Sequence, residues 1–424
     1  MRVGIIGCGN ISETYFNCQN IYNNFKVTSC SDIDIDVAKN SAEKFNVKAQ
    51  IVEDLLSDSE IDLIINLTVP SSHKEVIINS LNAGKHCFSE KPLAMNFNEG
   101  KEIYNLAKNT FLNSGCDDET ATIMADLVTK AEKDGSLSHG LFRVPAYVAG
   151  LKSGKINGKG KPDIKIISAS VVKANGNNCL APVVLNKSIP KLIKLAKENG
   201  VAILSITNSH HMAAMWPETE IIAEQGLVAI ACTSYKPAVA PAGSIKPLFG
   251  TNPISFAWPR KNKSPVVFDM ATASMAMGEV QVAKREGHKV PLGTGLTKEG
   301  KDTTDPAEIA DGGVLLPFGG YKGSGIAMMV ELLAGALVGD NFSYETAEKD
   351  NNDGGPPSGG EFILAISPDK LSDTDWDTHS SKFFDKMKTM GDVRLPGERR
   401  HKNRLDKGPR HINEDLVNKI KSLS

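Results

Sequence analysis

The chain has 424 residues, which is long enough for two or three domains. Hydrophobic residues make up 41% and charged residues 23%, as in a folded globular protein, and the net charge of −2 argues against nucleic acid or an anionic membrane surface as a partner. The longest apolar stretch, residues 325–339, contains Glu331 and is too short to cross a bilayer, so we expect a buried core helix there. Seven scattered cysteines without a C-x-x-C pair predict free thiols in a reducing compartment, the cytoplasm.

The first hundred residues alternate between strand and helix patterns. "RVGIIG" predicts a central parallel strand, and the turn "GCGNIS" follows it. Gly7 and Gly9 would let a pyrophosphate approach backbone N–H groups at a helix N-terminus, while Ser12 occupies the third small position. A second strand ends at Asp32, the spacing expected for a carboxylate that binds a ribose hydroxyl. A glycine turn alone is weak evidence, but the whole pattern predicts a Rossmann-type half-domain.

Two further motifs make this segment more specific. They are "TVPSSH", with Thr68, Pro70 and His73, and "EKP" at residues 90–92. With them, residues 1–108 resemble the nucleotide-binding domain of the Gfo/Idh/MocA sugar oxidoreductases. In that family the lysine of the second motif, here Lys91, lies near the nicotinamide. The family continues into a large open-sheet substrate domain, whereas the sequence of this chain after residue 108 has a different pattern. The resemblance therefore implies a cofactor domain without its catalytic partner.

Residues 109–424 form a second region with a different pattern. Residues 117–135 predict a helix that Asp117 caps and Gly135 ends. The segment "KSGKINGKGKPD" has the composition of a linker, and residues 346–360 have that of a solvated loop. The expected parts of this region are a helical N-terminal part (109–160), a core (161–345) and a C-terminal return (361–415).

Two histidine-containing clusters in this region are candidates for chemistry. Ser138 and His139 are adjacent, and a histidine beside a hydroxyl can act as a relay acid. Arg143 follows one turn later and can bind a carboxylate through two hydrogen bonds. His210 and His211 are also adjacent, but neighbours on a strand point to opposite faces and no third ligand stands at metal spacing, so we expect no metal.

Three further segments suit a substrate or a nucleotide. "FGTNP" presents the hydroxyl of Thr251 on a turn. "LPFGGYKGSG" places Tyr321 and Lys322 at the start of an apolar helix, where N–H groups, the helix dipole and a cation favour phosphate. "RLPGERR" concentrates arginines in a Pro-Gly turn, which also suits phosphate. Taken singly, each pattern fits an ordinary helix start or a solvated charge run equally well.

Together these motifs make residues 111–415 resemble the malate/L-lactate dehydrogenase-like reductases, a family that binds NAD(P)H on a non-Rossmann fold of its own. The likeness also includes "HMAAMWP", "DMATASMAMGEVQVAKREGHKVPLGTG" and "FSYE". It is greatest to the Δ1-piperideine-2-carboxylate/Δ1-pyrroline-2-carboxylate (ketimine) reductases. The expected fold class is therefore α/β, with an N-terminal Rossmann-like parallel sheet fused to a malate/L-lactate dehydrogenase-like α/β domain.

The resemblance implies roles for individual residues. Ser138 and His139 match the family's proton-relay pair, and Glu279 stands where the family has an aspartate as the third member. Arg143 and Thr251 match the substrate contacts. Tyr321 stands where close relatives often have histidine. The implied cofactor-binding residues are His211, Met212, Ala213, Ala214, Met215, Asp269, Met270, Ala271, Tyr321, Lys322, Arg394, Leu395, Pro396, Gly397, Glu398, Arg399 and Arg400.

The resemblance further implies a reductase of small cyclic imino acids that uses NADPH, or NADH, and acts as a homodimer without nucleic acid, membrane or metal. Its reactions would be Δ1-piperideine-2-carboxylate to L-pipecolate and Δ1-pyrroline-2-carboxylate to L-proline. Three alternatives stay open at this point. They are a 2-oxo-acid reductase (malate, lactate or sulfolactate) with His211 as the acid, a sugar oxidoreductase acting through Lys91, and a non-catalytic nucleotide-binding protein.

Overall fold

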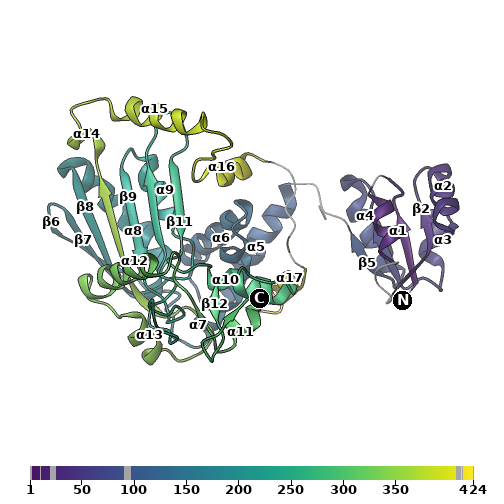
Figure 1. Cartoon of the computed structure of the whole chain (residues 1–424), viewed down its shortest axis with the longest axis horizontal. Coiled ribbons are helices and arrows are strands. Elements are labelled where there is room, and N and C mark those ends of the chain that lie inside the picture. The colour runs from purple at the N-terminus through teal and green to yellow at the C-terminus, as the bar shows by residue number, and fades with distance from the viewer. Residues whose placement is uncertain are drawn as a thin grey trace. The chain divides into compact units, whose positions relative to one another are not determined.

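The computed structural model describes residues 2–9, 11–19, 25–89, 97–406, 412 and 414–423. Figure 1 shows two compact units, Met1–Glu102 with Lys407–Glu414, and Ile103–Asp406 with Asp415–Ser424. The division falls inside helix α5 (Phe97–Asn113), a few residues before the boundary expected at 108/109. Each unit has a hydrophobic core of its own, so each is described by itself.

The first unit is a parallel sheet with the strand order β3-β2-β1-β4-β5, as the sequence predicts. Val3 and Ile5 of the central strand pack with Phe16 on one face, whereas Ile6 packs with Leu55 on the other. The strand is therefore apolar on both sides because helices cover both faces. The elements are β1 (Arg2–Ile6), α1 (Ser12–Cys18), β2 (Lys26–Ser31), α2 (Ile35–Phe45), β3 (Lys48–Ala49), α3 (Val52–Ser57), β4 (Leu63–Asn66), α4 (Pro70–Asn82) and β5 (His86–Ser89).

The glycine turn after β1 has the tight geometry that the motif predicts. Gly7 has a φ of +102°, and a Cβ there would lie 2.5 Å from the carbonyl carbon of Leu67, so only glycine fits. The backbone N–H of Cys8 donates to Asp32 Oδ2 at 2.7 Å. A Cβ at Gly9 would meet no atom within 4 Å. The predicted ribose carboxylate of Asp32 thus also closes the turn, and Lys91 lies outside the described residues.

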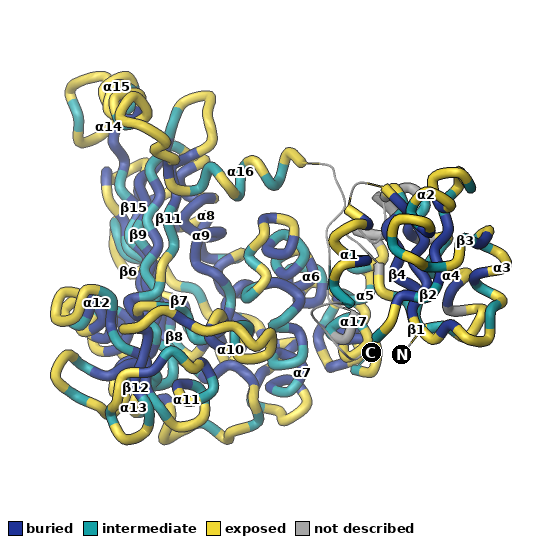
Figure 2. Tube along the Cα trace, turned by 45° about the vertical axis from the view of Figure 1, so that its right-hand side comes forward, coloured by how far each residue is buried: buried dark blue, intermediate teal, exposed yellow. Residues whose placement is uncertain are grey.

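The second unit is built on a mixed sheet with the order β11-β10-β9-β15-β8-β7-β6. Only the β7–β8 pair is parallel. Leu204 and Ile363 face α8 and α9 in the main core, whereas Ile203 and Phe362 face the opposite side, and Figure 2 shows these strands largely buried. The elements are β6 (Asp163–Ser168), β7 (Val171–Leu180), α8 (Ala181–Asn199), β8 (Val201–His210), α9 (Trp216–Glu224), β9 (Val228–Thr233), β10 (Ile254–Trp258), β11 (Val266–Met270) and β15 (Ser358–Ile366).

A smaller sheet, β13-β12-β14, accompanies the large one and has its own core around Val280 and Ile309. Helix α16 returns to the large sheet, where Arg400 donates to the Val267 carbonyl of β11, and its Arg404 binds Asp134 at the end of α6 through both carboxylate oxygens. The remaining elements are α10 (Met277–Glu286), β12 (Gly295–Leu296), β13 (Asp302–Thr303), α11 (Pro306–Ala310), β14 (Val314–Leu315), α13 (Ser343–Lys349), α14 (Pro368–Leu371), α15 (Trp376–Lys388), α16 (Glu398–Leu405) and α17 (Glu414–Lys421).

The N-terminal part of this unit is helical, as expected. Helix α6 (Asp118–Lys133) begins where the Asp117 side chain accepts a hydrogen bond from the N–H of Thr120, and it ends before Gly135, whose φ is +79°. Two 3-10 turns, Leu137–His139 and Leu141–Arg143, then lead into α7 (Val144–Lys152). This run of short turns brings the predicted relay residues Ser138 and His139 close to Arg143, the predicted substrate contact.

The longest apolar stretch is only half buried. It forms α12 (Tyr321–Glu331) and a π-helix (Leu332–Leu337). Ala327 and Val330 are fully buried, which confirms the core helix on one face, but Met328 is 53% and Leu332 50% exposed. Among the described residues no helix is long and apolar enough to cross a membrane. All seven cysteines carry thiols rather than disulfide bonds.

The prediction of a linker at residues 152–163 is wrong. Ile156 is buried, and the N–H of Asn157 donates to the carbonyl of Asn178 at 2.8 Å. A Cβ at Gly158 would lie 2.8 Å from the carbonyl oxygen of Gly115. The glycines therefore serve close backbone packing at the start of α6 rather than flexibility.

The prediction of a solvated loop at residues 346–360 is also wrong for most of its length. Helix α13 occupies the beginning and β15 the end. Between them, Lys155 binds Asp350 at 2.9 Å and Asp353 at 2.5 Å, and a Cβ at Gly355 would lie 2.8 Å from the backbone of Gly150. The acidic residues and glycines hold this segment against α7.

Candidate functional site

The two 3-10 turns bring the predicted relay pair into contact. Ser138 Oγ lies 3.0 Å from His139 Nδ1, which leaves the Nε2 atom of the imidazole available to a ligand. Burial, with the charge of Arg143 and then that of His211, lowers the pKa of His139 to about 3. His139 is therefore neutral near pH 7 in the chain by itself, so it can carry one mobile proton on Nε2 when the Ser138 hydroxyl donates to Nδ1.

Arg143 is a guanidinium without a carboxylate partner among the described residues. Its Nε is buried without a hydrogen-bond partner, and burial lowers its pKa. A Cβ at Gly278 would lie 2.9 Å from Arg143 Nη2 and 3.4 Å from Ser138 Cβ. Glycine at this position therefore lets α10 begin directly beside the relay and the guanidinium. An unpaired buried cation here is an arrangement that favours a bound carboxylate.

Two tyrosines complete the surroundings of Arg143, and neither was among the predicted site residues. Both lie near enough to raise the pKa of Arg143, and burial raises the pKa of each phenol. Tyr147 follows Arg143 by four residues at the start of α7, so it shares that helix face. Tyr235 packs against Gly250, where a Cβ would lie 2.6 Å from the Tyr235 carbonyl oxygen.

Thr251 lies on the turn that follows Gly250, beside Tyr235. Its carbonyl accepts hydrogen bonds from the N–H and the Oγ1 of Thr272, at 2.9 and 3.1 Å. Asn252 next to it is fully buried and donates to Glu331 Oε1 at 2.7 Å. The turn is thus held firmly, and the Thr251 side chain keeps partial exposure.

Glu279 is exposed in the first turn of α10, and no hydrogen bond joins it to His139 among the described residues. Its neighbour Gly278 does contact the relay, as described above. The role of Glu279 as the third relay member stays a prediction.

Glu132 is a buried carboxylate of this region that sequence analysis missed. Its Oε2 accepts a hydrogen bond from the N–H of Leu141 at 3.0 Å, between the two 3-10 turns. A Cβ at Gly140 would lie 2.1 Å from that same oxygen, so a larger residue there would displace the Glu132 carboxylate. Burial raises the pKa of Glu132 to about 7. Glu132 therefore fixes the turn that carries His139 and Arg143.

Strand β11 gathers the four segments predicted to bind the cofactor. Asp269 Oδ2 accepts hydrogen bonds from the N–H groups of Met215 and Trp216, at 2.7 and 3.0 Å. On the same strand, the N–H of Val267 donates to the Pro396 carbonyl at 3.2 Å, and Arg400 donates to the Val267 carbonyl at 2.9 Å. The strand thereby joins "HMAAM" to "RLPGERR".

The segment that contains Tyr321 and Lys322 contacts the chain just after β11 ends. The N–H of Phe318 donates to the carbonyl of Thr272 at 3.0 Å, and Ala273 pairs with Pro317. Tyr321 and Lys322 follow in the first turn of α12, and both are exposed. These segments, far apart in the chain, thus lie along β11 and the turn that follows it.

Several of the predicted cofactor residues are core residues in this structure. Met212, Ala214 and Met215 are buried, and Met215 belongs to the main core. Leu395 is also buried, with Phe384. Glu398 accepts from the N–H of Leu395 at 3.1 Å and so closes the turn. The residues that keep partial or full exposure are Ala213, Asp269, Met270, Ala271, Arg394, Pro396, Gly397, Glu398, Arg399 and Arg400.

His211 is buried and points toward carboxyl groups. Its Nε2 lies 3.3 Å from Glu218 Oε1, and the candidate donor atoms of His211, Glu218 and Glu361 all lie within 4.8 Å of one another. This cluster could not be expected from the sequence, because Glu361 comes from β15, far along the chain. The absence of a carboxylate near His211, which the sequence analysis assumed, is therefore wrong.

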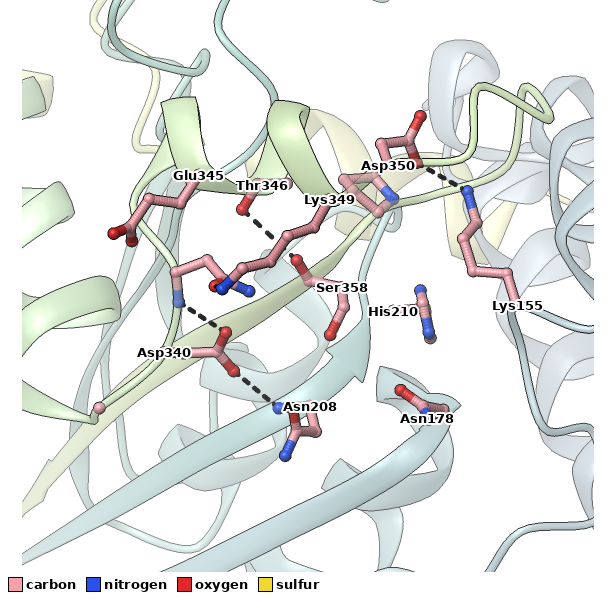
Figure 3. Close-up of a pocket in the computed structure, with 13 residues that line it drawn as sticks. Lys155, Asn178, Asn208, His210, Asp340, Glu345, Thr346, Lys349, Asp350 and Ser358 are labelled. Carbon is pink, nitrogen blue, oxygen red and sulfur yellow. Dashed lines mark hydrogen bonds and ion pairs between the residues drawn. The ribbon is translucent and has the colours of Figure 1, made fainter.

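A polar cavity of about 620 Å³ lies elsewhere in the second unit. Figure 3 shows it lined by polar side chains, where Lys155 pairs with Asp350 and Asp340 accepts from the N–H of Asn208. His210 lies at this cavity, with Nδ1 3.0 Å from the Pro356 carbonyl. None of the predicted site residues line it. The adjacent histidines therefore lie in different places, since His210 lines this cavity and His211 contacts Glu218.

Two family models match the chain. One, described as "Malate/L-lactate dehydrogenase", matches residues 99–421. The other, described as "Oxidoreductase family, NAD-binding Rossmann fold", matches residues 1–112. Both resemblances expected from the motifs are confirmed.

Individual relatives match the larger part of the chain. A Delta(1)-pyrroline-2-carboxylate/Delta(1)-piperideine-2-carboxylate reductase from Pseudomonas putida is 42% identical over 72% of this chain and 89% of its own length. A (2R)-3-sulfolactate dehydrogenase (NADP(+)) from Chromohalobacter salexigens is 36% identical over 72% of this chain and 91% of its own length. The crystal structure of delta1-piperideine-2-carboxylate reductase from Pseudomonas syringae pvar. tomato is 39% identical, covers 77% of this chain and 98% of that one, and has a TM-score of 0.73.

Proposed function

The chain belongs to the malate/L-lactate dehydrogenase family, and from this premise we propose that it reduces small cyclic imino acids with a nicotinamide cofactor. The substrates would be Δ1-piperideine-2-carboxylate and Δ1-pyrroline-2-carboxylate, and the products L-pipecolate and L-proline. Relatives at 42% and 40% identity are named as reductases of these compounds. The single observation that carries the proposal is the unpaired Arg143 beside Ser138 and His139.

Arg143 would bind the substrate carboxylate. The guanidinium has five N–H donors and no acidic partner among the described residues, so it can form two parallel hydrogen bonds to a carboxylate. Binding would also neutralise the positive charge that lowers the pKa of His139. The substrate itself would thus make His139 a better holder of a proton.

His139 would hold a proton on Nε2 for the imine nitrogen. The Ser138 hydroxyl donating to Nδ1 keeps that proton on Nε2, which is the arrangement a proton donor needs. A protonated imine accepts hydride more readily than a neutral one. The cofactor, when bound, supplies that hydride.

The chain's own residues fit a nicotinamide dinucleotide in the second unit, and we propose NADPH. Arg400 has a buried Nε without a hydrogen-bond partner, and Arg394 and Arg399 are exposed next to it. Lys322 lies in the first turn of α12, after two glycines with positive φ. These cations and N–H groups would hold the phosphates, and the extra phosphate of NADPH suits the arginines of "RLPGERR".

We also propose that the protein is a cytoplasmic homodimer. The free cysteines support a reducing compartment. The exposed apolar residues Met328, Leu332 and Leu337 on α12 and the π-helix support a subunit contact, because a cluster of such side chains is uncommon on a monomer.

The test is NADPH oxidation with Δ1-piperideine-2-carboxylate, followed by identification of the product. Turnover with this imine and not with 3-sulfopyruvate supports the proposal. The second candidate, a 2-oxo-acid reductase, is favoured by the His211–Glu218 contact and by the sulfolactate dehydrogenase relative. Turnover with 2-oxo acids alone would establish that candidate instead.

A further inference from the structure

An enclosed polar cluster next to the proposed site has no part in the steps described so far. Glu218 on α9 is 4% exposed and Glu361 on β15 is 1% exposed. The two carboxyls and the His211 imidazole have atoms within 4.8 Å of one another. Three separate elements thus direct two acids and one base to the same point in the core.

The charges of this cluster do not balance if both acids are ionised. Neither oxygen of Glu361 accepts a hydrogen bond from an N–H or O–H donor of the described residues. No lysine or arginine in the described part of the chain pairs with Glu218 or Glu361, and only His211 lies in ion-pair range of Glu218. The carboxyl groups of Glu361 and Glu218 instead approach each other, with an oxygen atom of each within 4.8 Å of the other. A hydrogen bond between two carboxyls requires a proton on one of them.

We propose that Glu361 holds a proton that it donates to Glu218, and that this pair fixes His211 with its own proton on Nε2. Glu218 then accepts from both neighbours, and the Nδ1 atom of His211 is left as an acceptor. Glu218 and Glu361 are positioning residues, because they act through His211. The effect on turnover rests on the reductase function proposed above, but the location of the proton does not.

The surroundings agree with a single shared proton. Burial raises the pKa of Glu218 well above its ordinary value, and Asp269 raises it further, while the contact with Glu361 lowers it. Burial likewise raises the pKa of Glu361, as does Glu218, while His211 lowers it. The titratable groups that face the pair from neighbouring elements are His211, Asp269 on β11, Tyr147 on α7 and Cys232 on β9.

The fixed tautomer has a consequence for the relay. The charge of His211 acts on His139 and lowers its pKa. A neutral His211 with one defined proton therefore leaves His139 free to hold its proton for the substrate. Loss of the shared proton would leave two adjacent carboxylates in the core, and their mutual repulsion would displace the groups that hold His211 in place.

The test is infrared difference spectroscopy of the full chain without substrate or cofactor. A protonated carboxylic acid has a carbonyl stretching band separate from those of carboxylates. Because Glu132, whose pKa is about 7, would add a band of its own, every protein in this test also carries Glu132→Gln. The wild type in this background should retain the band at neutral pH, and Glu361→Gln should remove it. Glu348→Gln, which changes an exposed glutamate on α13, is the matched control and should retain it. A wild type without the band, or a band that survives in Glu361→Gln, would overturn the proposal.

Kinetics and metal analysis complete the test. Glu361→Leu should lower kcat by about 10- to 100-fold, as is usual for residues that orient a site group, and Glu361→Gln should recover most of that loss because its amide N–H can donate to Glu218. If Glu361→Gln is as slow as Glu361→Leu, a hydrogen-bond donor at this position does not restore activity, and the proposed role of the pair is contradicted. Stoichiometric divalent metal in the purified protein would show that a cation, not a proton, joins the carboxyls, and would overturn the proposal. The infrared result needs no turnover, so it stands even if the reductase assay fails.

Discussion

At the scale of single residues, Arg143 stands out because it has no acidic partner among the described residues. Other basic side chains of the second unit have acidic partners, as Arg404 has Asp134 and Lys155 has Asp350. Arg143 instead faces a tyrosine on each of two segments. A buried cation without an anion destabilises the folded chain, so its position beside His139 is best explained by an anion that arrives from outside.

Arg143→Met should raise KM for the imino acid steeply. Removing one partner of a buried charge-assisted contact costs about 2–5 kcal/mol, which corresponds to a loss in kcat/KM on the order of 30- to several thousand-fold. The measurement is steady-state kinetics with varied imine at saturating NADPH. Arg285→Met is the matched control, because Arg285 lies over the same Phe142 ring at 6.0 Å but pairs with Glu286. Equal kinetics for the two variants would remove Arg143 from the site.

Glu132 should make stability depend on pH. Its pKa rises from about 4.5 in the unfolded chain to about 7 in the folded one, so between these values the folded chain keeps a proton that the unfolded chain has released. The free energy of unfolding is therefore highest below this window and falls as pH rises through it, by at most about 1.4 kcal/mol per pH unit. Glu132→Gln keeps an acceptor for Leu141 and should flatten this slope in urea unfolding. A slope that is the same in both proteins would show that Glu132 does not titrate there.

The sequence could predict those parts of the site that are formed by residues close together in the chain. Ser138 and His139 are neighbours and form the expected contact, and Asp117 caps α6 as its position indicates. Glu218 and Glu361 could not be paired from the sequence, because their meeting depends on where β15 enters the sheet. The residue-level prediction therefore succeeds for local contacts and fails for contacts that only the strand order creates.

At the scale of elements, the two glycine turns are two candidate nucleotide sites, one on each unit. The first follows β1, and a Cβ at Gly9 would meet no atom within 4 Å. The second precedes α12, where Gly319 and Gly320 have positive φ and Lys322 is exposed. Because Gly9 has room for a side chain, substitution there changes access to the turn without disturbing the fold of the first unit.

Gly9→Asp should abolish nucleotide binding by the first unit and leave imine reduction nearly intact, because the added carboxylate repels a pyrophosphate. Lys322→Glu should raise KM for NADPH by on the order of 10-fold or more, since it replaces an attraction of roughly 1 kcal/mol by a repulsion. The exposed Lys298→Glu is the control for net charge. The reverse pattern, with reduction lost in Gly9→Asp and retained in Lys322→Glu, would make the first turn the catalytic cofactor site.

The exposed apolar face of α12 should govern association. Leu332→Glu combined with Met328→Glu should convert a dimer to a monomer in light scattering, because two charges would be buried in the contact. Phe383→Glu, on the exposed face of α15, is the control and should leave the dimer unchanged. If the double variant remains dimeric, the subunit contact lies elsewhere.

At the scale of the whole molecule, the chain consists of two units with separate cores. The expected parallel sheet and the expected mixed domain are both present, since each arises from local patterns of apolar residues. The expected linker and loop were mistaken because glycine and acidic residues were taken as signs of solvent exposure. In the structure Gly158 and Asp350 make close packing and ion-pair contacts.

Separate cores predict two transitions in thermal unfolding. Gly7→Val should lower only one of them, since its Cβ would lie 2.5 Å from the Leu67 backbone in the first unit. Differential scanning calorimetry of the full chain resolves the two transitions, and imine reduction should follow the unaffected one. A single transition that shifts as a whole would show that the units unfold together.

The strand order of the large sheet also bears on how the protein is made. β15 is the last of its strands to leave the ribosome, yet it lies at the centre, between β8 and β9. Until residue 366 has been synthesised, the nascent chain holds two partial sheets, each with an open edge that will later be covered. Such edges pair readily with other chains, so we expect the second unit to need chaperones during synthesis more than the first, whose sheet is complete within its first 89 residues.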